Sequence, residues 1–396
     1  MKSFDWIVVG AGITGAALSY ELIRHGFSVL LLERHSLLQG ATRFGYGGLA
    51  YWSGTTELMR QICAEGKAIH QTLSQELEAD TQFRELDLVL TIPPDADLEA
   101  TAQSYAHFAD SPRLVSVEEA CELEPLLNPA AIAGALTVKH GHIAPEATAR
   151  AYTQAMIRLG GKVQVGQVTG LLRGENLRIT GVICGEEVYH SANVAVCAGA
   201  LSRSLLKTAG IPVRLYFTHG ELVETPPIEL NLRTLVMPAN TQRFQLEAKA
   251  SKIELDVLWD QPGYEPAPAI LDAGAIQMRD GTVRMGQVSR TLTDPNALVD
   301  AQKSEAEIRT QVGRILPALK DLPGTWHHCL IAFSHDRLPL IGAIPGHEGV
   351  HLFSGFSNPL AIVPPLARRF ARNVTGKTDE LLAQLSPTRF GSSTRS

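Results

Sequence analysis

The sequence predicts an α/β fold, in which a domain with a mixed sheet is interleaved along the chain with an α+β domain built on a mostly antiparallel sheet. A strand, a glycine-rich turn, a helix and a second strand follow one another within residues 1–33. Similar strand-then-turn patterns return near residues 195 and 350, so strands from the start, middle and end of the chain can share one sheet. Residues 211–325 carry short strand-like runs that favour a second sheet.

The composition suits a folded protein of two or three domains. The chain has 396 residues, of which 45% are hydrophobic and 19% are charged, and this excludes intrinsic disorder. A formal net charge of −6 gives no basic excess for nucleic acid. The five cysteines include no C-x-x-C pair, so we expect neither a disulfide framework nor a metal site. The start lacks a signal-peptide pattern and no run of 18 apolar residues occurs, so we expect a cytoplasmic protein without a membrane segment.

The first predicted elements are a strand over residues 6–9, a helix over residues 16–23 and a strand over residues 27–32. The first strand is apolar throughout, which is typical of a strand buried on both faces. Gly26 provides the left-handed residue that commonly ends a helix. The order of these elements predicts a Rossmann-like unit.

Three glycines occupy the turn between the first strand and the helix. Gly10 allows the tight turn, Gly12 lets the backbone approach a pyrophosphate, and Gly15 lets the helix pack close to the strand. The helix N-terminus offers unpaired N–H groups to the phosphates. Glu33 is placed to accept hydrogen bonds from ribose hydroxyls and would repel a 2′-phosphate, so FAD or NAD fits better than NADP. The predicted dinucleotide site also includes Ile13, Thr14 and Arg34.

Further elements follow from the same patterns. In the second domain we expect strands over residues 86–92, 216–223 and 282–287, and a helix over residues 301–315. In the first domain we expect helices over residues 145–159, 201–209 and 362–374, and a strand over residues 350–353. The small polar tail, residues 391–396, is expected to fray.

The segment after Glu33 runs from Gln39 to Gly48 and reads QGATRFGYGG. It resembles the D-amino-acid oxidase-like superfamily of FAD-dependent oxidoreductases, which includes glycine oxidase, monomeric sarcosine oxidase and D-amino-acid dehydrogenases. In that group a Ser/Thr-containing loop and a glycine pair wrap the pyrophosphate and pass over the flavin. The resemblance implies FAD as the cofactor, and it adds to the site Ala41, Thr42, Arg43, Gly47 and Gly48. A flexible surface loop is the alternative from composition alone.

Three later segments carry the same resemblance, which runs from about residue 4 to about residue 376. In the family, backbone groups at the position of Val168 contact the adenine. A strand then ends in a small-residue turn, here Cys197, Ala198 and Gly199. The C-terminal signature places a helix N-terminus at the flavin, and its counterpart here consists of Gly355, Phe356, Ser357, Asn358, Pro359 and Leu360.

The resemblance also implies the division into domains. Residues 1–80, 140–210 and 326–377 would form the FAD-binding domain, and residues 81–139 and 211–325 the substrate domain, followed by a tail over residues 378–396. Substrate would bind between the two domains.

The implied reaction is oxidation of the C–N bond of a small amine or amino acid, by hydride transfer to flavin N5 and hydrolysis of the imine. Oxygen or another acceptor would reoxidise the flavin. Four candidates for catalysis are Arg43, Tyr216, His219 and Arg337. In sarcosine oxidase an arginine at the place of Arg43 lies over the flavin, whereas binding phosphate or facing solvent are its alternatives. Tyr216 and His219 begin a strand that crosses the active site in the family, with a core role as their alternative.

Residues at two positions distinguish members of the family from one another. Cys329 matches the cysteine that links covalently to flavin in sarcosine oxidase, and a buried free thiol is the alternative. Glycine oxidase has a carboxylate-binding arginine five residues before the aspartate of the C-terminal signature, here Asp336. Ile331 stands at that place and puts glycine oxidase activity in doubt. The possible substitutes Arg279, Arg284 and Arg290 are surface residues in the simpler interpretation.

Alternative functions stay open at this point. Related folds oxidise the C–O bond of 2-hydroxy acids or polyols, and other members of the superfamily act as assembly or scaffold proteins with a structural flavin. A dehydrogenase that uses NAD alone is a further alternative.

Overall fold

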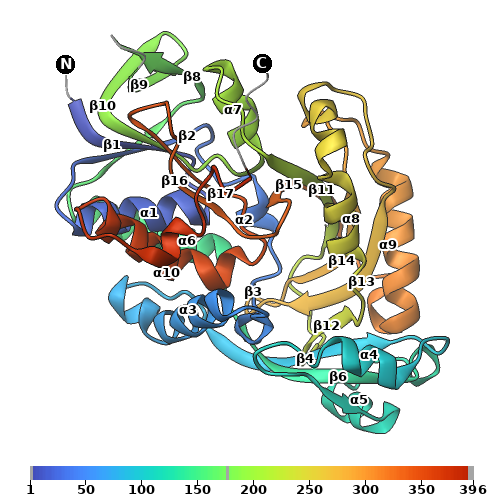
Figure 1. The fold of residues 1–396 in the computed structure, drawn as a ribbon. Coiled ribbons are helices and arrows are strands. Elements are labelled where there is room, and N and C mark those ends of the chain that lie inside the picture. The colour runs from blue at the N-terminus through green and yellow to red at the C-terminus, as the bar shows by residue number, and fades with distance from the viewer. Residues whose placement is uncertain (1–2, 175–177, 391–396) are drawn as a thin grey trace.

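The computed structural model describes residues 3–174 and 178–390 of the chain. The expected fraying of residues 391–396 concerns a segment outside these ranges. The strands of the described residues form two sheets, with helices packed against both (Figure 1). No helix in this part of the chain is long and apolar enough to cross a membrane.

The first sheet is mixed, as expected, and β1 (Ser3–Val9) lies near its centre. β1 pairs in parallel with β2 on one side and with β10 on the other. β7 and β17 extend this parallel set, β16 closes one edge in antiparallel pairing, and the hairpin of β8 and β9 pairs with β10. The bounds are β2 (Val29–Glu33), β7 (Lys162–Val165), β8 (Val168–Arg173), β9 (Ile179–Cys184), β10 (Glu187–Val196), β16 (Leu340–Ala343) and β17 (Val350–Ser354).

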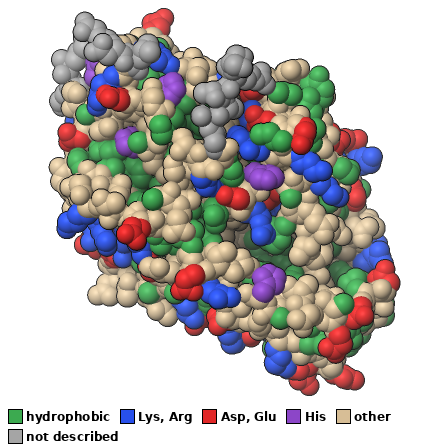
Figure 2. Space-filling view, viewed as in Figure 1, with side chains coloured by type: hydrophobic (Ala, Val, Ile, Leu, Met, Phe, Trp, Pro, Cys, Tyr) green, Lys and Arg blue, Asp and Glu red, His purple; other side chains and the backbone are tan. Residues whose placement is uncertain are grey.

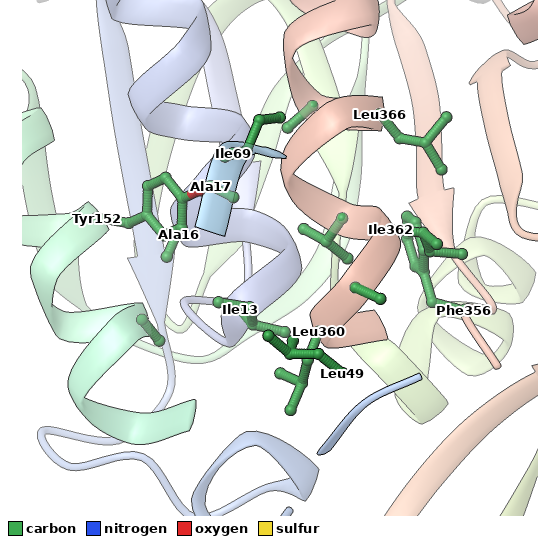
Figure 3. Packing of buried hydrophobic residues seen from close by; sticks show 14 of the residues in the cluster. Ile13, Ala16, Ala17, Leu49, Ile69, Tyr152, Phe356, Leu360, Ile362 and Leu366 are labelled. Carbon is green, nitrogen blue, oxygen red and sulfur yellow. The ribbon is translucent and has the colours of Figure 1, made fainter. Parts of the chain in front are cut away.

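Both faces of the first sheet are buried, because successive residues of β1 enter different cores. Trp6 and Val8 pack into the core that holds α1, α3, α6 and α10, whereas Ile7 and Val9 pack into the core beneath α7. Figure 3 shows part of the first core, where Ala17, Tyr152 and Leu366 come from three different helices. The bounds are α1 (Ile13–Arg24), α3 (Glu57–Glu76), α6 (Pro145–Arg158), α7 (Ser202–Thr208) and α10 (Pro359–Asn373).

The second sheet has the order β15-β11-β14-β13-β12-β4-β6-β3, with β5 paired to β6. Its pairs are antiparallel except for β12 with β4, as expected for a mostly antiparallel sheet. α9 (Ala301–Ile315) covers one face, and the other face turns toward the first domain (Figure 1). The bounds are β3 (Gly48–Leu49), β4 (Arg84–Ile92), β5 (Arg113–Val115), β6 (Gly134–His142), β11 (Leu215–Glu224), β12 (Leu235–Pro238), β13 (Ile270–Gln277), β14 (Val283–Arg290) and β15 (Thr325–Ser334).

Short helices complete the described chain. They are α2 (Ala41–Phe44), α4 (Leu98–Ser104), α5 (Val117–Leu123), α8 (Gln242–Ala250), α11 (Glu380–Ala383), and the 3₁₀ helices η1 (Tyr51–Ser53), η2 (Pro129–Ala131), η4 (Gly199–Leu201), η5 (Ile253–Asp260) and η6 (Pro317–Leu319). On the face shown in Figure 2, acidic and basic side chains are interspersed.

Most expected elements are present, with shifted ends. The helix over residues 301–315 has the predicted bounds, whereas α10 begins at Pro359 instead of residue 362, because proline suits the first helical position. β15 was not predicted. It pairs with β11 along its whole length and therefore lies in the second sheet, although residues 326–377 were expected in the first domain. β3, from the segment 1–80, also lies in the second sheet.

The turn after β1 brings α1 into contact with the strand end. A Cβ atom added to Gly15 would lie 1.8 Å from the carbonyl oxygen of Gly10, so a helix with any side chain here would have to move outward. Gly10 has a φ of +102°, and a Cβ there would lie 2.7 Å from the carbonyl oxygen of Cys197 at the end of β10. Glycine is therefore required at both positions.

We expect Gly15→Ala to lower the free energy of unfolding by about 3 kcal/mol, because the clash is with backbone and cannot be relieved by a side-chain rotation. Thermal and urea unfolding measure the effect. Gly40→Ala is the matched control, because nothing lies within 4 Å of its added Cβ. Equal stability of the two variants would contradict the close approach of α1.

Candidate active site

The predicted dinucleotide residues meet at the N-terminus of α1. A Glu33 carboxylate oxygen accepts a hydrogen bond from the Ala11 amide at 2.8 Å, which holds the acid beside the glycine turn. The Ile13 amide donates to Thr42 Oγ1 at 3.0 Å, and the Thr14 hydroxyl donates to the Cys197 carbonyl at 3.4 Å. Three distant segments thus converge on one helix end, where amide groups and the helix dipole favour a phosphate.

Other predicted cofactor residues lie around this turn. Gly199 has a φ of +55° and follows Cys197 and Ala198 directly after β10. Ala41 and Arg43 belong with Thr42 to α2, and Val168 begins β8. Arg34 is exposed just beyond β2.

Two histidine side chains of β6 pack against the glycine pair Gly47 and Gly48. Added Cβ atoms would lie 2.7 Å from His142 Nε2 and 2.6 Å from His140 Nε2, so the imidazoles need glycine at both positions. Trp52 Nε1 donates to His140 Nδ1 at 2.9 Å, and the neutral ring therefore carries its proton on Nε2. Burial lowers the pKa of both histidines to about 3, so both rings are neutral at pH 7.

The Tyr46 hydroxyl and His140 Nε2 are buried at this glycine pair and have no hydrogen-bond partner among the described residues. Buried polar groups are normally paired, so these atoms indicate a polar ligand. The edge of a flavin carries both donors and acceptors, and the residues present fit FAD.

The C-terminal signature joins this region through α10. Asn358 Nδ2 donates to the Ala50 carbonyl at 3.1 Å, and His70 Nε2 contacts the Leu360 carbonyl at 2.7 Å. Gly355 has a φ of +81°, Phe356 is buried beside it, and Pro359 begins the helix. Segments 47–50 and 355–360 therefore lie together.

Arg43 links the two expected domains through hydrogen bonds and ion pairs. Its guanidinium donates twice to Glu224 of β11, at 3.0 and 2.8 Å, and it also pairs with Glu146 of α6 at 3.3 Å. Arg284 of β14 binds the same Glu224 at 2.8 Å and donates to the Gly45 carbonyl. Burial alone would raise the pKa of Glu224, but the hydrogen bonds from Arg43 and Arg284 outweigh it and lower the pKa to about 2. A cavity of about 180 Å³ lies beside Arg43, Glu224 and Arg284.

The other candidates for catalysis do not lie with Arg43. The Tyr216 hydroxyl donates to Asp256 at 2.8 Å within an aromatic cluster, and the side chain is fully buried. His219 Nδ1 contacts His328 Nε2 at 2.7 Å. Arg337 is exposed, with its guanidinium 4.4 Å from the centre of the Phe244 ring, and its carbonyl accepts from Ser357 Oγ at 2.7 Å.

His219 lies on the α9 face of β11, as the next residue on that side shows. Glu221 binds Arg290, and Arg290 donates to Ser304 of α9 at 3.3 Å. The inner face, toward the first domain, instead carries Glu224. Catalytic roles for Tyr216, His219 and Arg337 stay predictions.

Cys329 and Ile331 lie on β15, whose partner strand is β11. Cys329 pairs with Gly220 and is buried, and burial raises the pKa of its thiol to about 12. The Cδ1 atom of Ile331 lies 2.7 Å from where a Cβ of Gly220 would be, so this side chain crosses the inner face of the sheet.

Sequence reasoning missed the residues that depend on long-range pairing. Glu224 gave no signal, because its arginine partners lie 181 and 60 residues away. The sequence did contain a signal for Asp272, because this residue is a single acid within a run of apolar and small residues, Ala269 to Ile276. The histidines of β6 also alternate, as residues on one strand face do.

We expect Glu224→Gln to change the acid sensitivity of the fold. The ordinary pKa of 4.5 is lowered to about 2, so Glu224 contributes stability above pH 4.5 that is lost as the pH falls toward 2. The stability gap between wild type and variant should be widest near pH 7 and should narrow toward pH 3, as measured by thermal unfolding. Glu186→Gln, at an exposed position, is the control. A gap that is constant with pH would contradict the ion pair.

Comparisons with known proteins agree with this geometry. The family model for DAO, described as FAD dependent oxidoreductase, matches residues 5–373. The chain is 26% identical over 407 residues to Uncharacterized oxidoreductase YurR of Bacillus subtilis (strain 168), covering 98% of each chain. It is 26% identical over 386 residues to Glycine oxidase of Pseudomonas aeruginosa, covering 94% of each.

A solved structure shares the fold. The glycine oxidase from Geobacillus kaustophilus superposes with a TM-score of 0.79 at 18% identity, over 98% of this chain and 99% of that one. The match of the family model to nearly the whole described chain carries more weight than this likeness. The chain belongs to the DAO family of FAD-dependent oxidoreductases.

Proposed function

We propose that the protein oxidises the C–N bond of a small amine or amino acid. The observation that carries the proposal is the meeting of segments 47–50 and 355–360 through Asn358 and Ala50, beside β3 at the edge of the second sheet. This contact puts the N-terminus of α10 next to the glycine pair at which the buried polar atoms have no partner among the described residues. The full-length likeness to a glycine oxidase supports amine chemistry over the alternatives.

Different residues of the chain would hold different parts of the cofactor. Gly10, Gly12, Gly15 and Glu33 would hold the adenosine and pyrophosphate, and Thr42 would give up its contact with the Ile13 amide to a phosphate oxygen. Bound FAD supplies the acceptor for a hydride from the carbon next to nitrogen, and water then hydrolyses the imine.

At the flavin end, the neutral His140 would donate from Nε2, and the N-terminus of α10 would stabilise negative charge. The inner face of the second sheet would exclude water from the reacting carbon.

We propose further that FAD binds without a covalent bond. A thiol attacks as the thiolate, and burial keeps the Cys329 thiol protonated by raising its pKa, although Arg243 and Arg284 offset part of that effect. Cys329 then serves as a small buried side chain opposite Gly220.

We expect the purified protein to be yellow and to release its colour into the supernatant when it is precipitated with acid. Cys329→Ala should keep the same flavin content per protein as wild type, as measured by absorbance. Colour that stays in the wild-type pellet and leaves it in Cys329→Ala would establish the covalent link instead.

We expect small amines or amino acids to bleach the flavin anaerobically, and turnover to release ammonia or a free amine. A panel of amines, amino acids, 2-hydroxy acids and polyols, with product analysis, measures this. A keto product without amine release would favour C–O oxidation, and a bound flavin that no member of the panel reduces would favour a non-catalytic role.

A further inference from the structure

Asp272 is a buried acid on the inner face of the second sheet. It lies on β13 at an irregularity of the pairing with β14, between Leu271 and Gly274. Its neighbours Leu271 and Ala273 pack into the core beneath α9, so the Asp272 side chain points to the opposite face, toward the first domain. The residue is 8% exposed, and its Oδ1 atom has no hydrogen-bond partner among the described residues.

Gly274 follows Asp272 on β13, and Gly286 and Gly220 lie on the next two strands, β14 and β11. Side chains from other positions reach over all three glycines. Added Cβ atoms would lie 2.7 Å from Ile331 Cδ1 at Gly220, 3.1 Å from Tyr46 Oη at Gly286, and 2.5 Å from Met237 Sδ at Gly274. Gly274 pairs directly with Gly286. Over Gly274 and Gly286 lie the Met237 sulfur and the Tyr46 hydroxyl, and this hydroxyl also has no partner in the described chain. The Gln287 amide lies beside Ile331 at Gly220.

The cations near Asp272 already have acidic partners. Arg243 binds Glu247 at 3.0 Å, and Arg284 binds Glu224 at 2.8 Å. Burial raises the pKa of Asp272, and Arg243 and the Asn240 amide offset only part of this effect. A buried carboxylate without a full set of partners costs free energy, so its presence calls for a ligand that offsets the cost.

The place where glycine oxidase has its carboxylate-binding arginine is occupied here by Ile331, whose side chain lies over Gly220. Arg337 next to the signature is exposed over Phe244. Ile331 on β15 thus offers no cation to a substrate, and the same sheet instead carries a buried acid, Asp272, three strands away on β13.

We propose that Asp272 binds the ammonium group of the substrate, and that the site selects small cationic amines with an apolar remainder over amino acids anchored by their carboxylate. The proposal rests on the proposed function, since it names the substrate class of the same site. The Tyr46 hydroxyl is the second polar group that the ammonium meets.

Binding to the holoenzyme tests this without turnover. Three probes of similar size differ in charge: tert-butylammonium is a cation that cannot be oxidised because the carbon next to its nitrogen carries no hydrogen, tert-butanol is neutral, and pivalate is an anion. Perturbation of the flavin absorption reports their dissociation constants. We expect wild type to bind tert-butylammonium at least about tenfold more tightly than pivalate, as for a charge-assisted hydrogen bond.

Asp272→Asn should weaken binding of tert-butylammonium about tenfold and leave tert-butanol within about twofold. Glu265→Gln, at an exposed acid just before β13, should change neither. Tighter binding of pivalate by wild type, or an unchanged preference in Asp272→Asn, would overturn the proposal. The wild-type comparison stands even if Asp272→Asn fails to fold.

The outcome is separable from that of the proposed function. Amine turnover with a preference for pivalate would refute the role of Asp272 and leave amine oxidation standing. A cation preference that Asp272→Asn removes, in a protein whose flavin no amine reduces, would support the binding site and refute the reaction.

Discussion

The contact of α1 with the turn after β1 is the constraint on which the site depends. Because Gly15 sits against the Gly10 carbonyl, the helix begins directly at the sheet edge, and its free amides face the ends of β2 and β10. Glu33 then reaches the Ala11 amide, and Thr42 reaches the Ile13 amide. A helix displaced outward by an added methyl group would move away from both contacts, so the predicted cofactor site depends on backbone packing.

The second sheet positions the glycine pair of the site. β3 leaves the first domain and pairs with β6, which places Gly47 and Gly48 against His142 and His140. Arg43, which precedes this glycine pair in the chain, binds Glu224 of β11 in the same sheet. The segment expected to pass over the flavin is thus held by the domain expected to bind substrate, and the two binding sites cannot shift independently.

The sequence predicted what local patterns determine. The β1–α1–β2 unit follows from glycine spacing and periodicity, and α9 from its amphipathic pattern ahead of Pro317. β15 was missed, because its place beside β11 depends on pairing across distant segments rather than on its own residues. The place of Arg43 over the flavin stays a prediction. Its partner Glu224 lies 181 residues away, and only the folded sheet brings the two together.

The pairing of distant strands also determines which charged groups on the inner face of the second sheet are neutralised. Its arginine Arg284 is neutralised by Glu224, and its histidines are neutral because burial lowers their pKa, so Asp272 is the acid left to meet a ligand there. The same face limits ligand size, since Ile331, Tyr46 and Met237 already cover the three glycines. A ligand of the proposed kind would present its positive charge to Asp272 and turn its apolar part toward Met237, which covers Gly274 on the same strand.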